Sequence, residues 1–283
     1  MKLLKLVPDN TNIKFLRLSN AFYAMSALLM AASIFLVFTK GLNLGVDFVG
    51  GQMIRVTFTQ SAEAPVAELR TQVGELGYGE PIIQQFGKPN EISVRMKLPE
   101  GSEADASLAD AMARKITATI KAEHPDARID GVDSVSGKVS GELFKTGMQA
   151  LFAAMLAISV YIWVRFEWQF GVGALLSLLH DVTLTLGLFA LTQMEFDLNI
   201  VAAILTLIGY SLNDTIVVYD RIRENLKKYR RMPMAELLDL SVNETLSRTI
   251  VTTLSLLIML VALLVLGPNV IFGFTAAITL GIF

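Results

Sequence analysis

The sequence contains no cysteine, and only 18% of its 283 residues are charged. The absence of cysteine excludes a disulfide framework, a cysteine-based metal site and a cysteine nucleophile. The net charge of −2 gives no indication of a nucleic-acid partner, and none is expected. No HExxH motif is present, and Ser177, which precedes His180 by one helical turn, lacks a nucleophile motif. We therefore expect no enzymatic activity, no metal and no cofactor.

Long apolar segments dominate what is present: 53% of the residues are hydrophobic, and the mean hydropathy is +0.53. A transmembrane helix needs roughly 20 apolar residues. Four blocks are long enough for one span each, and a fifth block contains a Gly-Pro-Asn sequence where a helical hairpin would reverse. These blocks are Ala21–Phe38, Thr146–Val164, Gln169–Met194, Leu198–Tyr219 and Thr249–Phe283, with the turn at Gly267-Pro268-Asn269. We predict a polytopic α-helical membrane protein with six transmembrane helices, the last of them truncated at Phe283, so that further residues are expected to follow.

The distribution of lysine and arginine predicts the orientation of the chain. Basic residues precede the first apolar block (Lys2, Lys5, Lys14, Arg17) and follow the fourth (Arg221 to Arg231), whereas the connection between the third and fourth blocks is acidic. Because cytoplasmic connections are rich in basic residues, residues 1–19 and 220–248 are predicted to be cytoplasmic. The basic cluster after the fourth block is interpreted as a topology signal that faces anionic lipid, and Met234–Leu240 as a short interfacial helix. The spans are then residues 20–39, 143–219 (helices 2–4) and 249–283 (helices 5–6).

Residues 40–142 differ in composition and are predicted to form a periplasmic domain. Alternating or apolar stretches predict strands at Gly51–Gln60, Pro81–Phe86, Glu91–Leu98 and Arg128–Val135. Apolar residues at 3- and 4-residue spacing predict helices at Ala64–Leu76 and Ala104–Ala122. The order βαββαβ is that of an α+β ferredoxin-like domain, with two helices on one face of an antiparallel sheet.

Asp214 is the leading candidate for a functional residue because it lies in the uncharged block Leu198–Tyr219. A carboxylate at that depth is costly and is a candidate for proton handling. Tyr210 and Ser211, at i−4 and i−3, could hydrogen-bond it, and Asn213 adjoins it. Arg248 opens the fifth helix at the same membrane face and is the nearest plausible cation. Two alternatives stay open: a static ion pair between two helices, or an Arg248 that only extends to the interface.

Several other polar residues are secondary candidates. His180 and Asp181 lie near the middle of the third helix, where they could relay protons or simply hydrogen-bond neighbouring helices. Adjacent helical positions point about 100° apart, so the two need not touch. Asp220 and Arg221 follow the fourth span and are expected in surface ion pairs.

The segment Leu44-Gly45-Val46-Asp47-Phe48-Val49-Gly50-Gly51 follows the first helix. Two adjacent glycines before a strand predict a special backbone turn, a hinge motif where the helix meets the domain. Gly45, Asp47, Phe48, Gly50 and Gly51 are its candidate residues. Phosphate binding is not expected, because no helix begins directly after the glycines.

These motifs together resemble the SecF branch of the SecD/SecF family of protein-export membrane proteins, within the RND superfamily. The resemblance rests on the Leu44–Gly51 segment, Arg165-Phe-Glu-Trp168, His180-Asp181, Ile208-Gly-Tyr-Ser-Leu-Asn-Asp214, Val217 to Glu224 and Thr245-Leu-Ser-Arg-Thr249. It covers essentially the whole chain.

The resemblance implies a multi-pass protein of the bacterial inner membrane. It implies a complex with SecD, association with the SecYEG channel, SecA and other accessory subunits of the translocase, and action on an unfolded preprotein. In this family the proton-motive force assists late, SecA-independent steps of translocation, with protons as the coupling ion. Asp214 and Arg248 fall on the proton-pathway aspartate and arginine of the family. A structural scaffold and a small-molecule efflux subunit are the alternatives.

Overall fold

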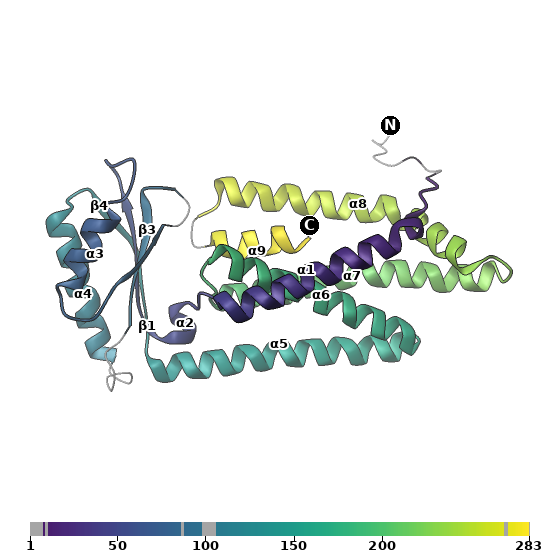
Figure 1. Ribbon diagram of the computed structural model, residues 1–283, viewed down its shortest axis with the longest axis horizontal. Coiled ribbons are helices and arrows are strands. Elements are labelled where there is room, and N and C mark those ends of the chain that lie inside the picture. The colour runs from purple at the N-terminus through teal and green to yellow at the C-terminus, as the bar shows by residue number, and fades with distance from the viewer. Residues whose placement is uncertain (1–7, 9–10, 86–87, 98–105, 269–270, 283) are drawn as a thin grey trace. The chain divides into compact units, whose positions relative to one another are not determined.

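The computed structural model describes residues 8, 11–85, 88–97, 106–268 and 271–282 (Figure 1). It divides into two compact units. The membrane unit comprises Met1–Asn43, Leu151–Met194 and Asn199–Phe283, and the outer unit comprises Leu44–Ala150 and Glu195–Leu198. Some residues used in the predictions above lie outside the described part: Lys2, Lys5, Phe86, Leu98, Ala104, Asn269, Val270 and Phe283.

The described residues of the outer unit form the predicted ferredoxin-like arrangement. Four strands make an antiparallel sheet in the order β2-β3-β1-β4, which is the order of a split βαβ fold. Both helices cover one face of this sheet (Figure 1). The elements are β1 (Gly51–Phe58), α3 (Val66–Gly74), β2 (Ile82–Gln85), β3 (Glu91–Met96), α4 (Ala106–Glu123) and β4 (Ala127–Val135).

The core of the outer unit lies between the sheet and the two helices. Ile54, Val56 and Phe58 alternate along β1 and are completely buried, as are Met112 and Ile116 on α4. The period of two in the strand and of four in the helix places each set on one face, which is the pattern that the sequence predicts.

Gly50 and Gly51, at the start of β1, adopt the backbone that the sequence predicts. Gly50 has φ 75° and Gly51 has φ 118°, values that side chains other than glycine rarely adopt. A Cβ atom on Gly51 would lie 2.3 Å from the carbonyl oxygen of Met96. A short helix, α2 (Val46–Val49), precedes them and was not predicted.

Among the described residues, five helices are long and apolar enough to cross a membrane. They are α1 (Ser19–Lys40, preceded by a 3₁₀ turn at Phe15–Leu18), α5 (Gly137–Arg165), α6 (Trp168–Thr192), α7 (Leu198–Lys228) and α8 (Met234–Leu266). The shorter α9 (Phe272–Ile282) packs against α8 and α6. Within the membrane unit α1 packs along α6. The prediction of a polytopic helical membrane protein with a ferredoxin-like domain is confirmed.

The segment 220–248, for which the sequence predicts a cytoplasmic loop, is largely helical in the structure. The helix α7 continues past Tyr219 to Lys228, and α8 begins at Met234, so that Met234–Leu240 is the start of a long helix rather than a separate short one. No proline or glycine interrupts α7 after Gly209, and Pro233 occupies the position before α8, where its missing N–H costs nothing. Charge and apolarity predict where a span ends, but the helix itself ends where a breaker occurs.

Candidate functional site: a polar cavity and a clasped turn

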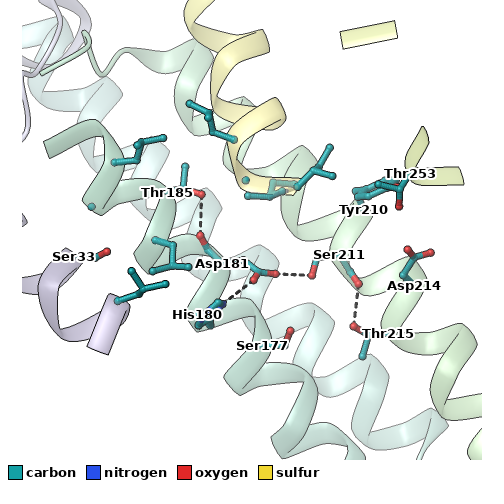
Figure 2. A pocket seen from close by; sticks show the side chains of 18 of the residues that line it. Ser33, Ser177, His180, Asp181, Thr185, Tyr210, Ser211, Asp214, Thr215 and Thr253 are labelled. Carbon is teal, nitrogen blue, oxygen red and sulfur yellow. Dashed lines mark hydrogen bonds and ion pairs between the residues drawn. The ribbon is translucent and has the colours of Figure 1, made fainter. Parts of the chain in front are cut away.

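A cavity of about 770 Å³ lies in the membrane unit, among the helices α1, α6, α7, α8 and α9. Its lining is mostly aliphatic, but Figure 2 shows a group of polar side chains from α6 and α7 along it. His180, Asp181 and Asp214 all line this cavity. The structure therefore brings together three residues that the sequence identifies separately.

Asp181 is the centre of a hydrogen-bonded group. The Ser211 hydroxyl on α7 donates to its Oδ2 at 2.6 Å, and the His180 Nδ1 lies 3.1 Å from its Oδ1 (Figure 2). In the part of the chain that the structure describes, the His180 Nε2 is buried without a hydrogen-bond partner. The neighbouring His180 and Asp181 side chains thus do touch, and they leave one ring nitrogen available inside the protein.

The expectation that Tyr210 and Ser211 hydrogen-bond Asp214 is wrong. Ser211 donates to Asp181, and the Tyr210 hydroxyl lies 3.0 Å from the Thr253 hydroxyl on α8. Both side chains therefore reach neighbouring helices, because a contact across helices depends on how the helices are rotated against each other and not on spacing along one of them.

Asp214 is half-buried, lines the cavity and carries no dashed contact in Figure 2. Arg248 on α8 is exposed. Among the described side chains, the two make no ion pair within 4.0 Å. The tight static pair left open by the sequence is therefore not the arrangement found here.

The remaining secondary candidates lie outside the cavity lining. Asn213 is exposed. Asp220 pairs with Arg165 at 3.2 Å, and Arg221 pairs with Glu224 at 3.1 Å, both at the surface. The prediction of surface ion pairs for Asp220 and Arg221 is confirmed.

The Leu44–Gly51 motif holds the turn at Glu195–Leu198, which leads from α6 into α7. The Gly45 N–H donates to the Phe196 carbonyl at 2.8 Å, and Leu44 forms a parallel bridge with Phe196. The Asp47 carboxylate accepts the Leu198 N–H at 3.1 Å. The Phe48 ring packs 5.9 Å from that of Phe196. We call these contacts the clasp.

Two charged residues that the sequence analysis did not select complete the clasp. Arg95 on β3 lies 3.7 Å from the Glu195 carboxylate and donates a hydrogen bond to the Leu44 carbonyl. Burial raises the pKa of the Glu195 carboxyl above its ordinary value, and the Arg95 guanidinium opposes that shift. The available signal was Glu195 itself, one of two acids in a connection without basic residues.

Comparisons with known proteins agree over the whole chain. The family described as protein export membrane protein SecD/SecF, C-terminal, matches residues 115–283, and the SecD/SecF GG motif matches residues 35–62. Protein translocase subunit SecF of Cereibacter sphaeroides is 45% identical over 282 residues, which cover 99% of this chain and 86% of that protein. SecF of Rhodobacter capsulatus is 43% identical over 289 residues, with the same coverage of 99% and 86%.

Two solved structures share the fold. The crystal structure of SecDF, a translocon-associated membrane protein from Thermus thermophilus, superposes with a TM-score of 0.86 at 33% identity and covers 98% of this chain. SecDF in its super-membrane-facing form gives a TM-score of 0.68 at 34% identity and covers 96% of this chain. This chain spans 37% and 36% of those two proteins. By sequence and by fold, the chain belongs to the SecD/SecF family of protein export membrane proteins.

Proposed function

We propose that this chain is a SecF-like translocase subunit that works with SecD and uses the proton-motive force to assist late, SecA-independent steps of preprotein export through the SecYEG channel. Its place is the bacterial inner membrane, with the N-terminus cytoplasmic and residues 40–142 periplasmic. The coupling ion is the proton, and the chain performs no covalent chemistry. The relatives named as SecF translocase subunits support this assignment.

The observation that carries the proton-coupling part is Asp214 in the polar cavity. It is an acid within an apolar helix that has no ion-pair partner among the described residues. An acid in this setting can exist in either protonation state, because no close cation holds it as a carboxylate. A guanidinium that approaches Asp214 favours the ionised form, and one that withdraws favours the neutral form.

The energy available from such a site is adequate for a conformational change. One elementary charge that crosses 100 mV releases about 2.3 kcal/mol. A two-state equilibrium shifts tenfold for about 1.4 kcal/mol, so one proton biases a movement of the protein appreciably. The Asp181, Ser211 and His180 group places a second set of hydrogen-bonding polar atoms along the same cavity.

Proton-driven export in energised membrane vesicles tests the proposal. Asp214→Asn keeps the size of the side chain and cannot release a proton, so it should abolish the stimulation of export by the proton-motive force. Asp220→Asn is the matched control, because it removes the same charge from the same helix at a surface ion pair outside the cavity. Near-normal stimulation in Asp214→Asn would favour a purely structural scaffold.

A further inference from the structure

The turn before α7 is held by backbone contacts from a distant part of the chain. Gly45 and Leu44 bind Phe196 through an N–H to carbonyl hydrogen bond and a parallel bridge. Since these contacts use the backbone, they fix the path of the turn whatever side chains it carries. The local sequence does not by itself determine this path, since the turn has no glycine or proline between Glu195 and Leu198.

Asp47 acts directly on the first residue of α7. The first N–H groups of a helix have no partner within the helix and carry partial positive charge. The Asp47 Oδ2 accepts the N–H of Leu198, the residue at which α7 begins, at 3.1 Å. The helix therefore receives an N-terminal cap from a residue 151 positions earlier in the chain.

The sheet of the outer unit contacts both the Leu44–Gly51 motif and the turn at Glu195–Leu198. Arg95 is an interior residue of β3, opposite Met53 of β1. Its guanidinium donates to the Leu44 carbonyl and lies 3.7 Å from the Glu195 carboxylate. One side chain of the sheet thus touches both the motif and the turn.

Aromatic packing closes the clasp. The buried Phe48 ring packs on Phe196 at 5.9 Å and on Phe144 of α5 at 5.5 Å. Phe196 itself is 3% exposed. A segment packed in this way is a firm attachment rather than a loose joint, which differs from the hinge that the glycines alone suggest.

The attached helix is the one that carries Asp214. The helix α7 runs without interruption from Leu198 to Lys228, and no proline occurs in it. A continuous helix transmits a shift or rotation from one turn to the next because its backbone hydrogen bonds are satisfied internally.

We propose that the Leu44–Gly51 motif is the coupling element between the Asp214 helix and the outer sheet, with Asp47 as the positioning residue that fixes the start of α7. This inference rests on the proposed function, since it assigns the route by which a change at Asp214 reaches the outer unit. The clasp stays closed throughout the cycle, so the turn and the sheet move as one piece.

A rescue experiment in the full chain, within its membrane complex, tests the proposal. Asp47→Ala removes the cap, whereas Asp47→Asn keeps an oxygen that can accept the Leu198 N–H. Asp47→Ala should accelerate hydrogen exchange of the Leu198 amide by about fivefold, the scale of a lost cap, and should abolish proton-driven export. Asp47→Asn should retain both.

A disulfide can replace the clasp, because the chain has no cysteine of its own. A Cβ on Gly45 would lie 3.2 Å from the Asp197 Cβ and 3.0 Å from the Glu195 Oε1, so the Glu195 side chain must shift slightly. The φ of −70° at Gly45 is a backbone angle that any residue adopts. Disulfides need about 3.5–4.5 Å between these atoms, so Gly45→Cys with Asp197→Cys requires only a small shift. When oxidised, this pair should restore export to Asp47→Ala, and reduction should remove it again.

The outcomes separate this proposal from the proposed function. In the chain that carries Gly45→Cys and Asp197→Cys, export should be the same in the oxidised protein as in the reduced protein. Loss of export on oxidation would mean that the turn must open, which overturns the proposal even if Asp47→Ala does not accumulate. Full export by Asp47→Ala would also overturn it. Normal proton-driven export by Asp214→Asn would instead reject the proposed function, while the exchange rate at Leu198 would still report on the cap.

Discussion

Ser211 on α7 donates a hydrogen bond of 2.6 Å to Asp181 on α6, and this bond joins the two helices inside the polar cavity. A side chain that hydrogen-bonds a neighbouring helix within a membrane typically contributes about 0.6 kcal/mol, with roughly 1.7 kcal/mol as the upper end. Loss of the Ser211–Asp181 bond can affect export more than it affects stability, because Asp181 also contacts His180 in the same cavity.

The first prediction concerns this bond. Ser211→Ala should lower the stability of the detergent-solubilised protein by roughly 1 kcal/mol and slow proton-driven export, because Asp181 loses its donor from α7. Thr206→Ala on the same helix is the control, since the exposed Thr206 hydroxyl donates to the Ala202 carbonyl of its own helix. Equal export by the two variants would show that the Asp181 group has no part in coupling.

The second prediction concerns pH and Glu195. Burial is the main cause that raises the pKa of Glu195 in the folded protein above the ordinary value of a glutamate carboxyl. Just above that value the folded state holds this proton more often than the unfolded state does, so stability falls as the pH rises through this range. Thermal unfolding of the purified chain at a series of pH values from about 4 upward should therefore show a midpoint that decreases with pH.

Variants of two clasp residues test whether Glu195 causes this pH dependence of the unfolding midpoint. Glu195→Gln cannot ionise and should flatten this pH dependence. Arg95→Gln should steepen it, because the guanidinium is the group that lowers the pKa of Glu195 most. A pH profile unchanged in Glu195→Gln would assign the titration to another carboxyl group.

The third prediction concerns Gly51. Gly51→Ala would place a Cβ 2.3 Å from the Met96 carbonyl oxygen at φ 118°, where the neighbouring strand cannot yield without loss of pairing. We expect a cost of at least about 2 kcal/mol in the outer unit, measured as lost protein accumulation and lower protease resistance. Gly141→Ala on α5 is the matched control, because a Cβ there meets nothing within 4 Å, and it should be tolerated.

The sequence predicts much of this fold because the signals are local. Block length identifies the spans, and the alternation of Ile54, Val56 and Phe58 identifies the sheet. Contacts between distant residues are different: the pairing of Ser211 with Asp181 depends on helix rotation, and that of Arg95 with Glu195 depends on a turn that folds back on the sheet. Spacing along one element carries neither kind of information, which is why Asp214 was assigned the partners that belong to Asp181 and Thr253.

The last prediction concerns Asn225, which joins α7 to α8 beyond the apolar part of the helices. Its side chain is 1% exposed, and its amide donates to the Ser241 hydroxyl at 3.0 Å and to the Glu244 carboxylate at 2.8 Å. Asn225→Ala leaves the buried Ser241 oxygen and one carboxylate oxygen without this donor, at a cost of about 1–3 kcal/mol.

The cost should appear as a lower unfolding midpoint and as faster proteolysis of the helical hairpin that ends α7 and begins α8. Asn213→Ala on the same helix is the comparison, because Asn213 is exposed and its loss should change the unfolding free energy by less than about 0.5 kcal/mol. If both substitutions have the same small effect, the end of α7 and the start of α8 are held by their apolar faces alone, and the extension of these helices past their apolar segments does not depend on the buried amide.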